Sequence, residues 1–312
     1  DGGRIKRVFG GGNGESTPSF TNPGANICGT ATTAIHGGIL NALFGGSNSK
    51  GDITTVALTL DNDGTCSDEF VVSLFGGANE SDIRSDVTLT IGCGAGNFEE
   101  VYGGSNKADI IDGDVTLNIL GGVIGSVYGG SKGTSTLAAN IDGNVTLNLF
   151  GGTITNAFGG SNVNGNITGI ITVNVEHTCQ GCPLNLTNVY GAGNLTAYTP
   201  DMVENKTPVS PIVNIKHIRQ GTSITGNVYG GGYGTTAVVT ANPKVTTRDD
   251  DAGHYATVGV LSGYDVLGGS VYGGGYAAPV VGNTSVEIKN PHSSAFKLFG
   301  GGANAGVTGN TS

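Results

Sequence analysis

The chain repeats a short segment in which aliphatic residues alternate with threonine or asparagine. The pattern is clearest in Val115-Thr-Leu-Asn-Ile119 and recurs at 56–60, 87–91, 145–149 and 171–175. A period of two is typical of a β-strand with one face in the core and the other in solvent. We therefore expect the aliphatic side chains to point inward and the threonine and asparagine side chains to point outward.

A second phrase, in which a valine, leucine or alanine precedes an aromatic residue and a glycine pair, occurs ten times. Its last two residues are Gly-Ala in a single copy. The aromatic residues of the ten copies are Phe9, Phe44, Phe75, Tyr102, Tyr128, Phe158, Tyr190, Tyr229, Tyr272 and Phe299. Successive copies are 26 to 43 residues apart, a period that is typical of solenoids, propellers and other repeat arrays.

Each repeat divides into three short strands joined by glycine corners. A propeller blade needs four antiparallel strands and about 40 residues, and most of these units are shorter. Apolar residues at helical spacing are absent and glycine is frequent, so we expect essentially no helix. We predict an all-β parallel β-helix (β-solenoid) of about ten turns with three short strands per turn, about 45–50 Å long.

We expect one continuous domain over residues 1–312, because a repeat array grows by the addition of units. Irregular spacing predicts insertions at about 14–33, 195–211 and 233–269. The last two are our candidates for specific contacts, because loops of this kind often carry function. The sequence begins just after one strand of the VTLNI type and stops just before another. It is expected to be either an excerpt of a longer array or a subunit whose copies stack end to end.

The glycine pairs are expected at corners where the backbone takes positive φ, a conformation that asparagine tolerates next best. Asparagine follows two residues after the first glycine pair in six repeats, at Asn13, Asn48, Asn79, Asn106, Asn162 and Asn194. The aromatic residues are expected to form a structural ladder of rings stacked turn on turn. We place the preceding aliphatic residue inward and the ring at the corner.

The acidic composition excludes several partners. Glycine accounts for 58 of 312 residues, and 24 acidic against 14 basic residues leave a net charge of −10. That balance argues against nucleic acid and anionic membrane surfaces, which both attract clustered Lys and Arg. Residues 143–175 carry no charge but are too rich in asparagine and glycine to lie in a membrane, so membrane insertion is not expected.

The five cysteines suggest two disulfides. Cys66 and Cys93 occupy equivalent positions in adjacent repeats and are expected either to form a disulfide or to remain free and buried. Cys179 and Cys182 are expected to close a small loop, since no second pair completes a zinc site. Cys28 is left over.

Stacked carboxylates are the one pattern that suggests chemistry. Asp112 aligns with Asp142 in the next repeat, and Asp86 aligns with Asp114, so each pair is expected about 5 Å apart. Such pairs bind calcium or cleave polysaccharides, although Asp-Gly sequences are first of all turn formers. No Lys or Arg recurs beside them, so we expect no enzyme and no cofactor other than a structural calcium ion at these four aspartates.

The outward rows also leave alternatives open. Files of threonine and asparagine on a flat sheet are found in ice-binding solenoids, although asparagine takes the second position in most turns here. Polysaccharide binding is a further alternative, but the chain has no tryptophan to stack on sugar rings. Eight Asn-x-Ser/Thr triplets permit glycosylation, although a chain rich in Asn and Thr makes them by composition.

The repeated phrase Val-Tyr/Phe-Gly-Gly-Gly/Ser-Asn, followed by Ile-x-Gly-Asn/Asp-Val-Thr-Leu-Asn-Ile, resembles the VFGGGN-type repeats of large bacterial secreted and cell-surface proteins. The resemblance covers nearly all 312 residues, with Tyr233 and Tyr276 in place of asparagine as departures. It implies a right-handed parallel β-helix and an extracellular location. We expect a structural or adhesive stalk or filament subunit whose partners are further copies or repeats of the chain, a glycan or a host surface.

Overall fold

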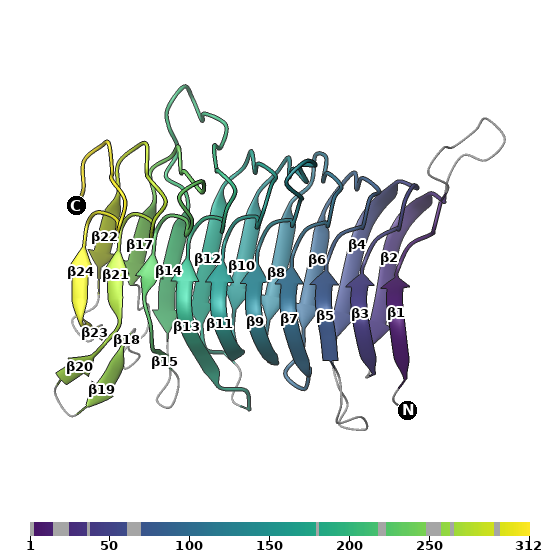
Figure 1. Ribbon diagram of the computed structural model, residues 1–312, viewed down its shortest axis with the longest axis horizontal. Helices are drawn as coiled ribbons and strands as arrows, with labels where there is room; N and C mark the ends of the chain where they lie inside the picture. Colours follow the sequence, from purple (N-terminus) through teal and green to yellow (C-terminus); the bar gives the residue numbers. More distant parts are fainter. Residues whose placement is uncertain are drawn as a thin grey trace.

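The computed structural model is an all-β solenoid in which two parallel sheets face each other along the length of the chain (Figure 1). It describes residues 3–14, 25–35, 38–60, 70–178, 181–217, 223–247, 257–262, 265–289 and 294–312. This part of the chain contains strands and no helix, as predicted. Besides the two large sheets it has one antiparallel pair, β19 (Val260–Ser262) and β20 (Asp265–Leu267).

The alternating segments form a nine-stranded sheet in which each strand pairs with its equivalents in the turns before and after it. Its strands are β2 (Ile27–Ile35), β4 (Ile53–Leu60), β6 (Val87–Ile91), β8 (Val115–Ile119), β10 (Val145–Leu149), β12 (Ile171–Glu176), β14 (Ile212–His217), β17 (Lys244–Thr247) and β22 (Ser285–Ile288). In β6, β8 and β10 the aliphatic residues are buried and the residues between them are half-buried. The alternation therefore assigns the two faces as predicted.

The strands that end in the aromatic residues form the second, thirteen-stranded sheet. They are β1 (Arg4–Phe9), β3 (Ile39–Phe44), β5 (Phe70–Phe75), β7 (Asn97–Tyr102), β9 (Val123–Tyr128), β11 (Gly152–Phe158), β13 (Leu184–Tyr190), β15 (Ser223–Ile224), β16 (Val228–Tyr229), β18 (Thr257–Val258), β21 (Ser270–Tyr272), β23 (Ser294–Ala295) and β24 (Lys297–Phe299). Each aromatic residue is in register with the aromatic residue of the next turn.

The predicted third strand of each turn is reduced to a single bridged residue. Ile53, Ile83, Ile110, Ile141 and Ile167 form isolated parallel bridges from turn to turn. The chain bends around this point, so only one residue pairs before the backbone turns into the next strand. The count of ten turns is also slightly too high, because nine strands in one sheet enclose about eight full turns.

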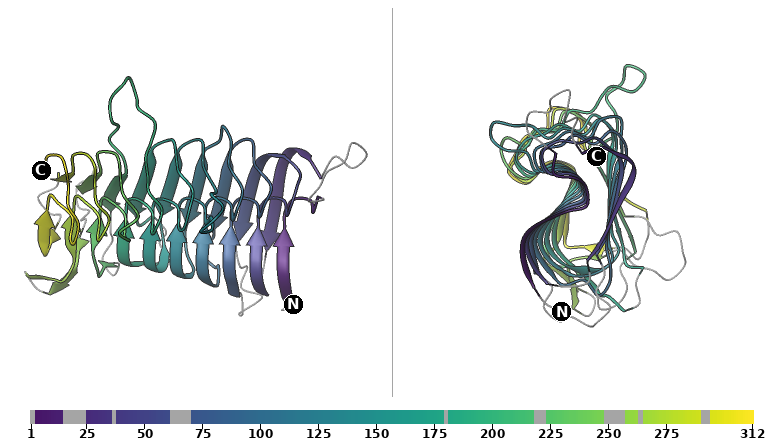
Figure 2. Two further views of the ribbon diagram at one scale, coloured as in Figure 1. Left: turned by 45° about the horizontal axis from the view of Figure 1, so that its top comes forward. Right: turned by 90° about the vertical axis from the view of Figure 1, so that its right-hand side faces the viewer.

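The turns wind in a right-handed sense. Seen from the N-terminal end, the chain rises through the strands of the larger sheet, crosses at the top and descends through the nine-stranded sheet while receding from the viewer (Figure 2, right). The cross-section is curved rather than flat. This handedness agrees with the strong preference of parallel crossovers for the right-handed connection.

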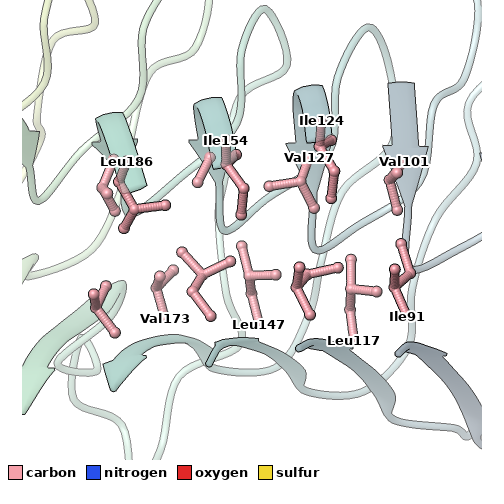
Figure 3. Close-up of a cluster of buried hydrophobic side chains, with 14 of the residues drawn as sticks. Ile91, Val101, Leu117, Ile124, Val127, Leu147, Ile154, Val173 and Leu186 are labelled. Carbon is pink, nitrogen blue, oxygen red and sulfur yellow. The ribbon is translucent and has the colours of Figure 1, made fainter. Parts of the chain in front are cut away.

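The core lies between the two sheets and repeats from turn to turn. Leu117, Leu147 and Val173 point from one sheet toward Ile124, Ile154 and neighbouring residues of the other (Figure 3). These residues are at most 1% exposed, and full burial of such side chains contributes about 1.5–3 kcal/mol each. A second apolar cluster lines the corner beside it and contains the bridged isoleucines.

The glycine pairs after the aromatic residues are needed for a different reason from the one predicted. Gly103 and Gly104 do not have positive φ. A Cβ on Gly103 would overlap the carbonyl oxygen of Gly129, and one on Gly104 would overlap the Ser131 hydroxyl. Glycine is therefore required in these pairs by the close approach of successive turns. Positive φ occurs at other glycines, among them Gly122 and Gly152 at the opposite corner and Gly133 and Gly165 further along the turn.

Two of the predicted insertions contain regular strands. The range 14–33 includes most of β2, and the range 233–269 includes β17. Residues 15–24 and the run Asp249-Asp250-Asp251 lie outside the described residues. The segment 195–211 does leave the stack and rises above the neighbouring corners between β13 and β14 (Figure 1).

Candidate functional site

Ten aromatic rings form one column along the solenoid. They are the rings named from the sequence, Phe9, Phe44, Phe75, Tyr102, Tyr128, Phe158, Tyr190, Tyr229, Tyr272 and Phe299, and successive centroids lie 4.7–5.0 Å apart. Successive ring planes differ by 3–10°. This spacing equals the distance between strands, so the column follows from the in-register sheet.

The column is a separate core on the outer side of the larger sheet. Val101 and Val127 point into the core between the sheets, while the adjacent Tyr102 and Tyr128 belong to a cluster of their own. These two rings are at most 4% exposed. Burial, followed by the nearby Glu100 carboxylate, raises the pKa of Tyr128 to about 12 and that of Tyr102 further. The phenols therefore stay neutral and act as packing groups.

A row of asparagines covers the column. Asn48 donates to Asn13 at 2.7 Å, Asn79 donates to Asn48 at 2.9 Å and Asn106 donates to Asn79 at 2.8 Å. Asn194 likewise donates to Asn162 at 2.9 Å. None of these residues has positive φ, so asparagine is used for its amide bonds between turns and not for its backbone tolerance.

Four repeats replace this asparagine, with Lys132, Tyr233, Tyr276 and Ala303, and these side chains also pack against the column. Lys132 lies 5.4 Å from the Tyr102 ring centroid and forms an ion pair of 2.8 Å with Glu100. Tyr233 and Tyr276 stack on each other with centroids 5.0 Å apart and meet Tyr190 and Tyr229 edge to face. The departures from the repeated phrase thus extend the aromatic cluster without breaking the corner.

The aspartates expected to bind calcium accept hydrogen bonds from the next turn. The Asp86 carboxylate accepts from the Asp114 backbone N–H at 2.9 Å, and Asp114 accepts from the Asn144 N–H at 2.7 Å. In the same way, the side-chain oxygen of Asn144 accepts a hydrogen bond of 2.9 Å from the Ile170 N–H. Because an amide replaces the carboxylate in this row, the shared property is the acceptor oxygen and not the charge.

The second predicted pair behaves differently. Asp142 accepts from the Thr168 hydroxyl at 2.9 Å, and Asp112 has positive φ of 53° at a turn. In the described ranges, no three His, Cys, Asp or Glu side chains come together in a way that could hold a metal ion. Calcium at Asp86, Asp112, Asp114 and Asp142 therefore stays a prediction.

The outer face of the nine-stranded sheet carries a second polar row. Thr88, Thr116, Thr146 and Thr172 are in register. Beside them Asn148 donates to Asn118 at 2.9 Å and Asn174 donates to Asn148 at 2.8 Å. The amides are thus bonded to one another from turn to turn along this face.

The disulfide joins Cys93 to Cys182, with Cα atoms 5.8 Å apart. This corrects both expected pairings, Cys66 with Cys93 and Cys179 with Cys182. The corner that holds Cys93 is longer than the two that follow, and it lies over Gly121. Sequence alignment of the repeats misses the bond because Cys182 belongs to a turn three units later. Cys66 and Cys179 lie outside the described residues, and Cys28 is exposed with a free thiol.

The segment between β13 and β14 is anchored at its base and exposed at its tip. Tyr198 donates to the Gly169 carbonyl at 2.8 Å and also contacts the Ser210 hydroxyl. At the tip, Met202 is 68% and Val203 58% exposed. This projection is the most exposed apolar feature of the described residues.

Comparison of the chain with protein-family models, curated proteins and solved structures finds no match. Among the residues that the structure covers, no helix is long and apolar enough to cross a membrane.

Proposed function

We propose that this chain is a non-enzymatic structural or adhesive solenoid of a bacterial surface, acting as a rigid stalk or as a subunit of a filament. The observation that carries the proposal is the column of ten stacked rings, which runs without interruption from Phe9 to Phe299. Its nine steps span about 43 Å at strand spacing. A continuous column beside two in-register sheets resists bending because every turn is held by its neighbours.

The polar groups support a structural role in the same way. Asparagine amides, aspartate carboxylates and five lysine or arginine side chains bond between adjacent turns. The VFGGGN-type resemblance and the disulfide both support an extracellular site, because disulfides persist in oxidising compartments.

Electron microscopy and equilibrium sedimentation of the intact chain test the structural form of the proposal. We expect straight particles of uniform width, either single rods or unbranched filaments of stacked copies. Flexible or globular particles would contradict it.

The exposed tip of the 195–211 segment supports an adhesive form. Replacing Met202 and Val203 by serine should reduce binding of the protein to host cells or immobilised glycans at least tenfold. Leu137→Ser, at a corner residue that is 53% exposed elsewhere on the rod, is the matched control and should leave binding unchanged. Equal loss in both variants would argue against a specific contact at the tip.

The polysaccharide-active alternative has its own test. Asp112 and Asp142 changed together to asparagine should abolish sugar release from acidic or neutral polysaccharides if the chain is an enzyme. We expect no release from either protein. Release by the wild type that disappears in the double variant would refute the non-enzymatic proposal.

Ice binding is supported by one observation, the in-register threonine file on the nine-stranded sheet. The mutual bonding of the adjacent asparagines weighs against it, because those amides are already engaged. Thermal hysteresis of the purified protein distinguishes ice binding from a purely structural role. We expect no thermal hysteresis.

A further inference from the structure

The Cys93–Cys182 disulfide spans part of the solenoid that contains no other described cysteine. Cys93 lies in the corner between β6 and β7, and Cys182 lies in the equivalent corner between β12 and β13. Two complete turns lie between them, with corners at 121–122 and 151–152. The bond therefore joins the first and last of four successive turns, 89 residues apart in sequence.

The intervening corners leave room for this link. A Cβ on Gly121 would lie 2.6 Å from the Cys93 Cα, and one on Gly151 would lie 3.2 Å from the Cys182 carbonyl oxygen. Both corners continue with a glycine at positive φ, Gly122 at 87° and Gly152 at 97°. Because the corners lack side chains, the two cysteine loops lie directly over them and meet.

The loop that contains Cys182 is held in place by His177 and by the corner of the preceding turn. His177, which is 7% exposed, has its Nε2 atom 3.0 Å from the Cys182 carbonyl oxygen. The Gly152 N–H donates to the Pro183 carbonyl at 2.9 Å, and the Thr178 N–H donates to the Phe150 carbonyl at 3.4 Å. These bonds tie the loop to the corner before it, on the side that faces Cys93.

We propose that this disulfide is a mechanical strap that keeps the chain between the two cysteines, strands β7 to β12, from being drawn out when the rod is pulled. The inference rests on the proposed stalk function, in which the chain bears load along its axis. A solenoid is held by contacts between neighbouring turns and can open one turn at a time. The strap encloses the chain between Cys93 and Cys182, so opened turns cannot extend beyond it.

Reduction releases the strap. The thiolate of a small dithiol attacks the disulfide to form a mixed disulfide, and its second thiol closes a ring as the oxidised dithiol leaves. Cys93 and Cys182 each gain one electron and one proton in this two-electron exchange. Since Cys93 is exposed, the bond is open to attack from solvent.

Single-molecule stretching of the whole chain from its two ends tests the strap. The 89 residues enclosed by the bond amount to about 300 Å of extended chain. Complete unfolding of the oxidised protein should therefore release about 300 Å less than unfolding in the presence of the dithiol. Cys93→Ser with Cys182→Ser should show the full length without reductant, and Cys28→Ser is the matched control that should retain the difference.

The lengths also separate the strap from other pairings. A Cys66–Cys93 bond together with a Cys179–Cys182 bond would hide only about 100 Å. A difference near that value, or none, overturns the proposal. A difference near 300 Å in a protein that neither forms rods nor binds surfaces would keep the strap and reject the proposed function.

Discussion

The side-chain amide of Asn162 donates a hydrogen bond of 2.8 Å to the phenolic oxygen of Tyr102, 60 residues earlier in the chain. The two residues belong to turns that are not neighbours, since Tyr128 begins the corner between them. Tyr102 is fully buried and Asn162 is 6% exposed. This bond links the aromatic column to the asparagine row that covers it, and it explains why tyrosine is used at this position where phenylalanine would stack equally well.

Tyr102→Phe should therefore destabilise the protein although the ring stack is kept. The Asn162 amide would lose its acceptor in a buried setting, which costs about 1–3 kcal/mol. Urea unfolding followed by circular dichroism measures the change. Tyr272→Phe, in the same column but half-buried, is the control and should cost less than about 0.5 kcal/mol. Equal effects would show that the hydroxyl bond is not the cause.

The close approach of turns at the glycine pairs predicts a difference between equivalent glycines. Gly104→Ala would force the new methyl group into Ser131 and should cost about 1–3 kcal/mol. Gly301 is the equivalent glycine of the last repeat, and a Cβ there meets nothing within 4 Å. Gly301→Ala should be neutral or slightly stabilising. Thermal unfolding of the two variants makes the comparison, and similar losses would contradict the packing argument.

Alkaline pH should weaken the fold through its buried phenols. Burial raises the pKa of Tyr128 and of Tyr198 to about 12, above the ordinary value of about 10 in the unfolded chain. The folded state then holds more protons, so the free energy of unfolding is unchanged below pH 10 and falls as the pH rises from 10 to 12. We expect a loss of about 1–2 kcal/mol per tyrosine.

Urea unfolding at a series of pH values, with tyrosinate absorbance recorded in parallel, measures this loss. Tyr128→Phe should reduce the slope between pH 10 and 12 because one raised phenol has been removed. A stability that is flat over this interval would show that the phenols are exposed to solvent.

The aspartate row distinguishes hydrogen bonding from calcium binding. Asp114→Asn keeps an acceptor oxygen for the Asn144 N–H, as Asn144 itself does for Ile170, and should change stability by less than about 0.5 kcal/mol. Asp114→Ala removes the acceptor and should cost about 1 kcal/mol. If calcium is bound instead, both variants should lose stability equally. A chelator should then lower the melting temperature of the wild type only. Melting curves with and without calcium decide between the two.

The aromatic positions show how much of the fold can be predicted from the repeats in the sequence. Their recurrence beside the alternating strands is sufficient to predict the parallel solenoid and the direction of the aliphatic side chains, since a period of two leaves only one way to bury Leu117 and Leu147. The stacking of rings follows from the same register. The outward file of threonines and asparagines is also read directly from the sequence.

The asparagine after the glycine pair has a role that the repeat pattern alone does not identify. Backbone tolerance of positive φ and hydrogen bonding between turns both favour asparagine, and the sequence does not distinguish them. The bond from Asn106 to Asn79 and the absence of positive φ at either residue settle the question in favour of hydrogen bonding. The aspartates at Asp86 and Asp114 likewise fit two explanations, a hydrogen bond to the next turn and the binding of calcium.

The sequence by itself determined the elements that repeat at every turn, because each depends on local alternation and on a neighbour in register. Only the tertiary structure decided the links between turns that are not adjacent, the Cys93–Cys182 disulfide and the bond from Asn162 to Tyr102. Such links depend on how far individual corners extend along the rod. That distance is set by the packing of loops over glycine corners such as 121–122. It cannot be read from the sequence of a single repeat.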